Sequence, residues 1–301
     1  MSARGTRQSP SGANDPDLPG AISGGAKLVG VIGWPVAHSL SPRLHGYWLR
    51  HHKIDGAYVP LAVRPEDFAS VLKTLPRMGF AGVNVTLPHK ESALAAVDTV
   101  DATAREIGAV NMIVATAEGR LDGRNTDAFG FIENLKHGAP EWEASVGPAV
   151  VLGAGGAARA VCRALADAGV PEIRIANRTI ARARGIAEAV GANTVPWDER
   201  SAALDGAALL VNATNLGMEG KPSLELDLTS LPAGAVVNDI VYNPIETGML
   251  KAAAARGNVV VDGLGMLLHQ ARPGFAAWFG TDPAVTEGLR AYVLRGLAGR
   301  G

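Results

Sequence analysis

Residues 148–158 read Pro-Ala-Val-Val-Leu-Gly-Ala-Gly-Gly-Ala-Ala and decide the fold of the second half of the chain. A short apolar strand pattern runs into a glycine-rich turn, and the pattern of an amphipathic helix follows. In such a turn Gly153 permits a tight reversal, Gly155 lets the backbone approach a pyrophosphate, and Ala158 allows close helix–strand packing. The amides at the helix start attract an anion. The flanking elements favour a dinucleotide site over a merely structural turn, and its predicted residues are Gly153, Ala154, Gly155, Gly156 and Ala157.

The end of the next predicted strand indicates which dinucleotide binds. Proteins that bind NAD usually place an acidic residue there, about 20 residues after the turn, to hold the ribose hydroxyls. Here the sequence is Asn177-Arg178-Thr179, with Arg182 one helical turn further on. No carboxylate repels a 2′-phosphate, and a guanidinium can pair with one. The sequence therefore predicts NADP(H), although arginines at a helix start are often merely solvated.

Alternating strand and helix patterns continue on both sides of the turn. The second half has predicted strands at residues 149–152, 172–176, 208–211, 235–238 and 259–261, and helices at 156–168 and 180–190. The first half has predicted strands at 28–32, 57–61, 82–86 and 109–114, and helices at 42–51, 65–75, 90–96 and 101–107. Such alternation is typical of α/β folds with mostly parallel sheets. Residues 263–295 form two helical patterns broken around 280–283 and have no strand of their own, so they must pack on an earlier part of the chain.

The composition excludes several kinds of partner. The chain has 301 residues, which favours two domains over one. Its net charge is −1 without a basic run, so nucleic acid is not expected to bind, and no apolar run reaches the length of a membrane span. The only cysteine, Cys162, suits a reducing cytoplasm and is expected to be a buried hydrophobe. No spacing of His, Cys and Glu predicts a metal site, and residues 1–26 are predicted to form a disordered tail.

Polar side chains follow one predicted strand of the first half. Residues 82–90 read Gly-Val-Asn-Val-Thr-Leu-Pro-His-Lys. Asn84 and Thr86 project from the same face of the strand, because side chains alternate with period two, and Lys90 follows where the strand ends. This is how a polar substrate and a proton donor could share one pocket, but a lone lysine is usually a solvated surface charge.

Two serines precede the first predicted helix. Ser39 and Ser41 are two residues apart, so an extended segment directs both hydroxyls the same way, and Pro42 suits the first position of a helix. Two hydroxyls at a helix start are a plausible cradle for a carboxylate. Equally, Ser41 could cap the helix and Ser39 could be an ordinary loop residue. The nearby His38, like His89, is expected to have a structural or pocket-wall role.

In order along the chain, these and further strings resemble the shikimate dehydrogenase family. The first half contributes Gly33-x-Pro35-x-x-His38-Ser39-x-Ser41-Pro42, Asn84-Val85-Thr86-x-Pro88-x-Lys90, Gly108-Ala-Val-Asn111 and Gly123-x-Asn125-Thr126-Asp127. The second half contributes the glycine turn, Asn177-Arg178-Thr179, Asn212-Ala-Thr214 with Gly217-Met218, Asp239-Ile-Val-Tyr242-x-Pro244, and Gly263-Leu-Gly-Met-Leu-Leu-His-Gln270-Ala271. The matches span residues 29–278, and chance agreement of several polar, non-repetitive strings is improbable.

The resemblance implies an NADP-dependent oxidoreductase that reversibly reduces 3-dehydroshikimate to shikimate, in chorismate and aromatic amino-acid biosynthesis. It implies a substrate-binding domain of residues 27–126 plus 263–301, in which the C-terminal helices complete the first domain, and a Rossmann-type NADP-binding domain of residues 127–262. The substrate carboxylate would be held by Ser39 and Ser41. The remaining implied substrate ligands are Asn84, Thr86, Asn111, Asp127, Tyr242 and Gln270, and the positions near the nicotinamide are Ile240 and Gly263.

Reduction of a ketone independently requires a proton donor. Negative charge develops on oxygen as hydride reaches the carbon, and a positioned acid lowers that barrier. Lys90 as an ammonium can act in this way, and a carboxylate nearby favours the charged form and orients it. Asp127 suits that role, although it could instead cap the helix that follows it. Because both residues lie in matched strings, they are predicted to be the catalytic pair, without assigning the proton to either one.

Two positions depart from the family pattern, and two other functions stay open. Gly46 stands where the family commonly has asparagine, and Met112 where it commonly has threonine, which bears on substrate preference. A quinate/shikimate dehydrogenase that prefers NAD is one alternative. A non-catalytic regulator that binds NADP or a metabolite is the other. The protein is expected to be a cytoplasmic monomer or homodimer that binds a small molecule.

Overall fold

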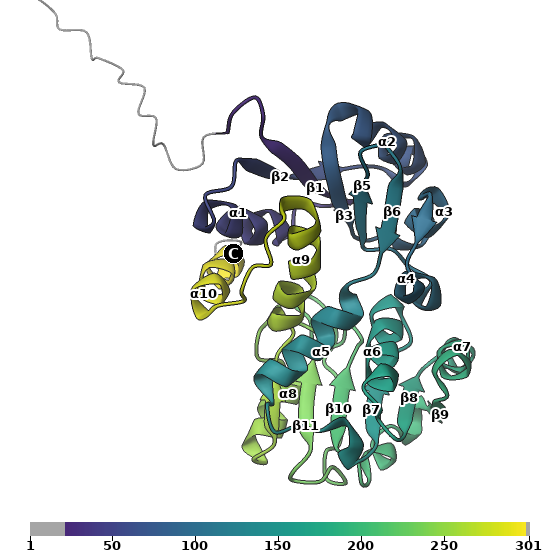
Figure 1. Ribbon diagram of the computed structural model, residues 1–301. Helices are drawn as coiled ribbons and strands as arrows, with labels where there is room; N and C mark the ends of the chain where they lie inside the picture. Colours follow the sequence, from purple (N-terminus) through teal and green to yellow (C-terminus); the bar gives the residue numbers. More distant parts are fainter. Residues whose placement is uncertain (1–21, 299–301) are drawn as a thin grey trace, which may run out of the picture.

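The first sheet lies in the N-terminal half of the chain and mixes parallel with antiparallel pairs (Figure 1). The computed structural model describes residues 22–298. The strand order is β2-β1-β3-β5-β6-β4. The strands are β1 Lys27–Gly33, β2 Gly56–Ala62, β3 Phe80–Val85, β4 Thr99–Val100, β5 Met112–Ala115 and β6 Leu121–Arg124. β1 pairs in parallel with β2 and β3, whereas β5 runs antiparallel to both β3 and β6.

The second sheet is parallel throughout and has the strand order β12-β11-β10-β7-β8-β9. Its strands are β7 Ala149–Leu152, β8 Ile173–Asn177, β9 Asn193–Pro196, β10 Leu209–Asn212, β11 Val236–Asp239 and β12 Val259–Val261. All four residues of β7, β10 and β11 are buried, as expected for central strands covered on both faces. This is the doubly wound, Rossmann-type arrangement that the sequence predicts.

Helices cover both faces of each sheet (Figure 1). The α-helices are α1 Ser41–His51, α2 Phe68–Thr74, α3 Lys90–Ala96, α4 Ala102–Ile107, α5 Asp127–Gly138, α6 Gly156–Asp167, α7 Ile180–Val190, α8 Gly248–Ala255, α9 Leu264–Phe279 and α10 Glu287–Ala298. Short 3₁₀ segments lie at Pro65–Asp67, Leu75–Met78, Ala144–Val146, Trp197–Glu199 and Ala202–Leu204. A cluster of buried apolar side chains joins α1 with α9 and α10 over one face of the first sheet. This confirms that the C-terminal helices return to the first half.

Several predicted bounds are wrong, for local reasons. The strand expected from Ala109 begins only at Met112, because the Val110 amide donates to the Lys90 carbonyl at 2.9 Å instead of entering a ladder. The single helix expected over 65–75 has 3₁₀ turns at both ends. Pro76 has no amide to donate to the carbonyl four residues earlier, so the last turn tightens.

Strands β4, β6 and β9 and helix α8 were not predicted. β6 is four residues long and reads Leu-Asp-Gly-Arg, which has little of the β-branched character of a typical strand. Of the predicted tail, residues 1–21 lie outside the described part of the chain. Ser23 is described, and its amide donates to the Asp55 carboxylate at 3.1 Å.

Candidate active site

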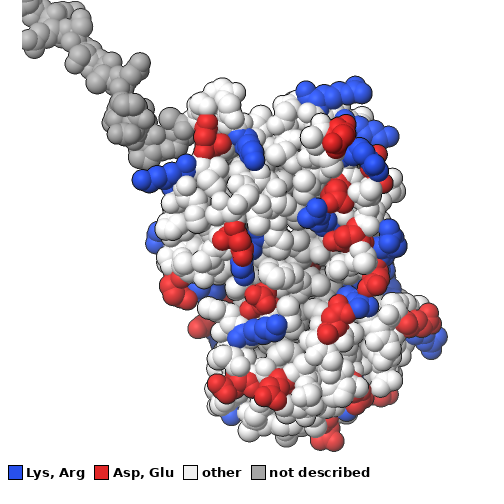
Figure 2. Space-filling view, in the orientation of Figure 1, with Lys and Arg blue, Asp and Glu red and all other residues white. Residues whose placement is uncertain are grey.

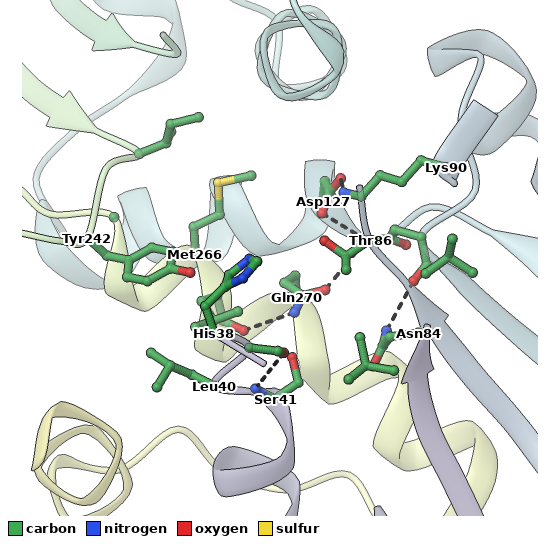
Figure 3. Close-up of a pocket in the computed structure, with 17 residues that line it drawn as sticks. His38, Leu40, Ser41, Asn84, Thr86, Lys90, Asp127, Tyr242, Met266 and Gln270 are labelled. Atoms are coloured by element: carbon green, nitrogen blue, oxygen red, sulfur yellow. Dashed lines mark hydrogen bonds and ion pairs between the residues drawn. The ribbon is translucent and has the colours of Figure 1, made fainter. Parts of the chain in front are cut away.

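A cavity of about 230 Å³ lies where the first sheet, α9 and the loop after β11 meet (Figure 3). Every residue predicted as catalytic or substrate-binding lines it: Ser39, Ser41, Asn84, Thr86, Lys90, Asn111, Asp127, Tyr242 and Gln270. Ile240 and Gly263, expected at the nicotinamide end, line it too. The fold therefore brings into one pocket residues that span most of the chain.

Lys90 and Asp127 form an ion pair at the edge of this cavity. The Lys90 Nζ lies 2.6 Å from Asp127 Oδ2, and the two side chains are 26% and 14% exposed. Lys90 is the first residue of α3 and Asp127 the first of α5, so both side chains project from helix starts. Thr126 is the N-cap residue of α5, so the Asp127 carboxylate is not at the capping position. Its bonds go to Lys90 and Asn111 instead, which argues against the capping alternative.

Asn111 anchors the other oxygen of the Asp127 carboxylate. Its Nδ2 donates to Asp127 Oδ1 at 2.8 Å, and its Oδ1 accepts from the Thr126 amide at 2.9 Å. The Asp127 amide donates to Asn125 Oδ1 at 2.9 Å. Both oxygens of the carboxylate are thus hydrogen-bonded, and the neighbouring residues fix its orientation toward Lys90.

The remaining ligands of the cavity come from β3 and the start of α1. Asn84 is buried, accepts from the Tyr58 hydroxyl at 2.6 Å and donates to the Asn111 carbonyl at 3.2 Å. The Ser39 hydroxyl accepts from the Ser41 amide at 3.3 Å, so Ser39 and not Ser41 bonds to the helix start. Leu40, not Ser41, is the N-cap residue of α1, and Ser41 is the first residue of the helix itself. Both serines line the cavity, as the cradle interpretation requires.

Gln270 reaches the cavity because helices α5 and α9 pack closely against each other where they cross. Gln270 Oε1 lies 3.4 Å from the Thr126 hydroxyl and 3.5 Å from Asn111 Nδ2. A Cβ added at Gly130 on α5 would collide with Gln270 Cβ and would lie 2.7 Å from the Met266 carbonyl. Glycine at this crossing therefore sets the position of Gln270.

We expect Gly130→Ala to weaken substrate binding and to destabilise the fold. The added methyl group must push α9 away, carrying Gln270 with it, and overpacking of this kind costs about 1–3 kcal/mol. Thermal unfolding and the KM for shikimate check this. Gly185→Ala on α7 is the matched control, because a Cβ there meets nothing within 4 Å. Parental stability and KM in the Gly130 variant would contradict the assignment.

The glycine turn has the geometry of a phosphate-binding loop. Gly153 adopts a φ of +109°, which only glycine tolerates readily. A Cβ at Gly155 or Gly156 would meet nothing within 4 Å, so the space over the turn is open. Helix α6 begins there without a side-chain cap, so its first amides are available to an anion. These residues fit a dinucleotide pyrophosphate.

Arg178 and Arg182 lie exposed beside the same edge of the second sheet, at the end of β8 and the start of α7. Within residues 22–298, neither guanidinium has a carboxylate at ion-pairing distance. Asn177 donates to the Thr179 carbonyl at 2.9 Å, which orders the turn that carries Arg178. The site fits a 2′-phosphate, and no acid takes the place that would favour NAD.

The histidines near the cavity differ in role. His38 lines it, whereas His89 is buried beside it, with Nε2 2.8 Å from the Val63 carbonyl and its ring stacked on Phe68. His45 is fully buried under the cavity and stacks on Tyr58 with ring centroids 4.0 Å apart. Burial lowers the pKa of His45 to about 3. No described group completes a hydrogen bond to either ring nitrogen.

This buried histidine is expected to make the fold labile to acid. Unfolded histidine takes up a proton near pH 6.5, but folded His45 does so only near pH 3, so stability falls as the pH drops between these values. His45→Phe keeps the ring stack and removes the titration. Urea unfolding at pH 7 and pH 4.5 should show a smaller loss of stability in this variant than in the parent. His51→Phe, at an exposed position, is the control, and an unchanged pH dependence in the His45 variant would contradict the expectation.

The sequence interpretation missed the apolar wall of the cavity. Met266 and Leu267 on α9 line it, together with Val31, Leu40 and Val85. Met266 lies four residues before Gln270 and Leu267 three residues before it, so helical spacing places all three on one face. That spacing was a signal available in the sequence. Cys162 is buried, as expected, and in the part of the chain that is described no group of His, Cys, Asp and Glu could hold a metal ion.

A Rossmann-type sheet with an open phosphate turn, joined to a polar cavity that holds a lysine–carboxylate pair, defines a nicotinamide-dependent oxidoreductase. Two family models match the chain, the shikimate dehydrogenase substrate-binding domain over residues 31–113 and shikimate/quinate 5-dehydrogenase over residues 141–217. The chain belongs to the NADP-dependent shikimate dehydrogenase family. It is 62% identical, over 91% of its length and 100% of the relative's, to the shikimate dehydrogenase (NADP(+)) of Paramagnetospirillum magneticum.

Solved structures with the same fold include two with bound nucleotide. Shikimate 5-dehydrogenase from Thermus thermophilus, in complex with NADP(H) and shikimate, is 42% identical with a TM-score of 0.80, covering 89% of this chain and 99% of that one. Quinate dehydrogenase from Corynebacterium glutamicum, in complex with NAD, is 32% identical with a TM-score of 0.82, covering 91% and 99%. This fold thus occurs both in a shikimate dehydrogenase bound to NADP(H) and in a quinate dehydrogenase bound to NAD.

Proposed function

We propose that this chain reversibly reduces 3-dehydroshikimate to shikimate with NADPH, and that Lys90 and Asp127 together carry the proton. The observation that carries the proposal is the 2.6 Å contact between Lys90 Nζ and Asp127 Oδ2 at the edge of a cavity lined by hydrogen-bonding side chains. NADPH, when bound, supplies the hydride. The open glycine turn and the exposed Arg178 are the residues that would hold its phosphates.

In the reductive direction the Lys90 ammonium donates to the ketone oxygen as negative charge develops there. Asp127 holds that ammonium in place and accepts a hydrogen bond from the neighbouring substrate hydroxyl. In the oxidative direction the same pair accepts the proton, which belongs to the coupled pair rather than to one residue. Asn111, bonded to the second oxygen of Asp127, keeps the carboxylate directed at Lys90.

Ser39 and Ser41 bind the substrate carboxylate at the start of α1, and the ring hydroxyls are bound by Asn84, Thr86, Asn111 and Gln270, with Tyr242 close by. All of these residues face the same cavity. The apolar side chains of Met266 and Leu267 close its other side and exclude water from the reacting carbon. The pocket therefore offers hydroxyl and amide groups to a small polyol acid.

The chain divides into a substrate-binding domain of residues 27–126 with 263–301 and an NADP-binding domain of residues 127–262. The separate six-stranded sheets support this division. Helix α5 lies at the boundary, where it packs against both α9 and α6 (Figure 1).

The partner is a small molecule, and the protein acts in the cytoplasm as a monomer or homodimer without binding nucleic acid. Acidic and basic side chains are interspersed on the face in Figure 2, which offers no broad basic surface to a phosphate backbone. Within residues 22–298, every helix is too short or too polar to cross a bilayer. The single cysteine is consistent with a reducing compartment.

Initial rates with shikimate and with quinate, each with NADP and with NAD, test the proposal. Shikimate with NADP should give the highest kcat/KM, measured from NADPH absorbance. A preference for quinate and NAD would make the chain a quinate dehydrogenase instead. Binding of both ligands without turnover would show a regulator that has kept the fold.

A further inference from the structure

A buried carboxylate that the proposed mechanism does not use lies at the end of β11. Asp239 is fully buried, and burial raises its pKa to about 6. Among the described residues, no lysine, arginine or histidine forms an ion pair with it. A carboxylate in such surroundings is costly unless hydrogen bonds compensate it, so its position depends on the donors around it.

Asp239 accepts three hydrogen bonds, one from strand β10 and two from the loop that follows β11. Its Oδ1 accepts from Asn212 Nδ2 at 2.9 Å, at the end of β10, and from the Val241 amide at 3.0 Å. Its Oδ2 accepts from the Thr247 hydroxyl at 2.7 Å. Thr247 is the N-cap of α8. The carboxylate therefore ties both ends of the loop 240–247 to the neighbouring strand.

That loop forms the wall of the active-site cavity on the side of the second sheet. Ile240 and Tyr242 both line the cavity, and Tyr242 lies across it from Lys90 (Figure 3). The Ile240 carbonyl packs directly against Gly263, where an added Cβ would collide with it. Gly263 is the residue from which α9, the helix of Gln270, begins. A shift of the loop would thus move two lining residues and press on the start of α9.

We propose that Asp239 is a positioning residue for the reaction, whose carboxylate fixes the loop 240–247 so that Ile240 and Tyr242 face the catalytic pair. The inference rests on the proposed function, and it adds a buried group from the second sheet to the machinery of the site. Asp239 acts through the loop and does not touch the substrate. Its acceptor oxygens, rather than its charge, perform this task.

The two substitutions Asp239→Ala and Asp239→Asn test whether the loop depends on a hydrogen-bond acceptor at residue 239. Alanine leaves the buried Val241 amide and Thr247 hydroxyl without their acceptor. Asparagine keeps Oδ1 for Asn212 and Val241, and its amide can donate to the Thr247 hydroxyl. We expect Asp239→Ala to lower kcat/KM for shikimate by about 10- to 100-fold, the cost of small misplacement in an active site, and Asp239→Asn to retain most of the activity.

Two readouts do not depend on turnover. Amide hydrogen exchange over residues 240–247 should quicken in the alanine variant and stay parental in the asparagine variant. The affinity for NADPH, measured by fluorescence titration, should fall less than kcat/KM, because the glycine turn and Arg178 lie on other segments and only Ile240 of the loop lies at the nicotinamide end. The control is Asn258→Ala. This buried side chain bonds the carbonyls of Pro232, Ala233 and Ala235 at the opposite end of β11, so its loss should lower the unfolding temperature and leave the kinetic constants parental.

The outcomes are distinguishable. A parent protein without shikimate-dependent reduction of NADP would overturn the proposed function, and the inference with it. An active parent whose Asp239→Ala variant keeps parental kinetics and exchange would overturn the inference alone. So would equal losses in the alanine and asparagine variants, because the acceptor Oδ1, which asparagine keeps, would then not suffice to hold the loop.

Discussion

Lys90→Ala is expected to lower turnover of shikimate by about 10²- to 10⁴-fold, the contribution of a positioned acid or base. Alanine removes the donor at the developing alkoxide and leaves the Asp127 carboxylate in the cavity without its cation. The KM for shikimate should stay within several-fold of the parental value. In the proposed binding mode the substrate carboxylate is bound by Ser39 and Ser41, which lie at the start of α1, whereas Lys90 begins α3.

Steady-state rates with varied shikimate at saturating NADP measure this split between kcat and KM. Lys73→Ala removes an exposed lysine from α2 and is the matched control, because it loses the same side chain far from the cavity lining. Full turnover in the Lys90 variant would remove Lys90 from the mechanism. An equal loss in the Lys73 variant would point to a general effect of lost charge.

Arg178→Asp is expected to raise the KM for NADP sharply and to leave the KM for shikimate unchanged. The substitution exchanges a guanidinium that can pair with the 2′-phosphate for a carboxylate that repels it. Arg178 is exposed and no described carboxylate pairs with it, so the fold should lose little stability. The same carboxylate can accept from a ribose hydroxyl, so the relative rate with NAD should increase.

Initial rates measured with varied NADP and with varied NAD check whether the nucleotide preference changes. Arg184→Asp is the control, because it makes the same charge change at an exposed position on α7, the helix that follows Arg178. Residues two apart on a helix do not share a face, so Arg184 points away from the side that carries Arg182. Unchanged NADP kinetics in the Arg178 variant would contradict its assignment to the 2′-phosphate.

The glycine turn and five of the six strands of the second sheet could be predicted from sequence, whereas β9 and helix α8 were missed. β7, α6 and α7 lie within a residue or two of their expected bounds, because apolar periodicity, glycine and the helix start are local signals. The first sheet was predicted less well. β6 follows β5 closely and pairs with it, but it is short and polar, so no apolar pattern marks it as a strand.

The sequence by itself determined the cofactor turn, the absence of an acid beside Arg178, and the residue types of the site. Only the tertiary structure decided that Lys90 meets Asp127 across 37 residues and that Gln270 approaches Asn111 across 159. Antiparallel pairing aligns Asn84 with Met112 and Met112 with Arg124, so the ends of β3 and β6 lie together around Asn111. Each helix or strand follows from residues adjacent in the sequence. The meeting of the site residues around Asn111 depends instead on strand register and on the close crossing of α5 and α9.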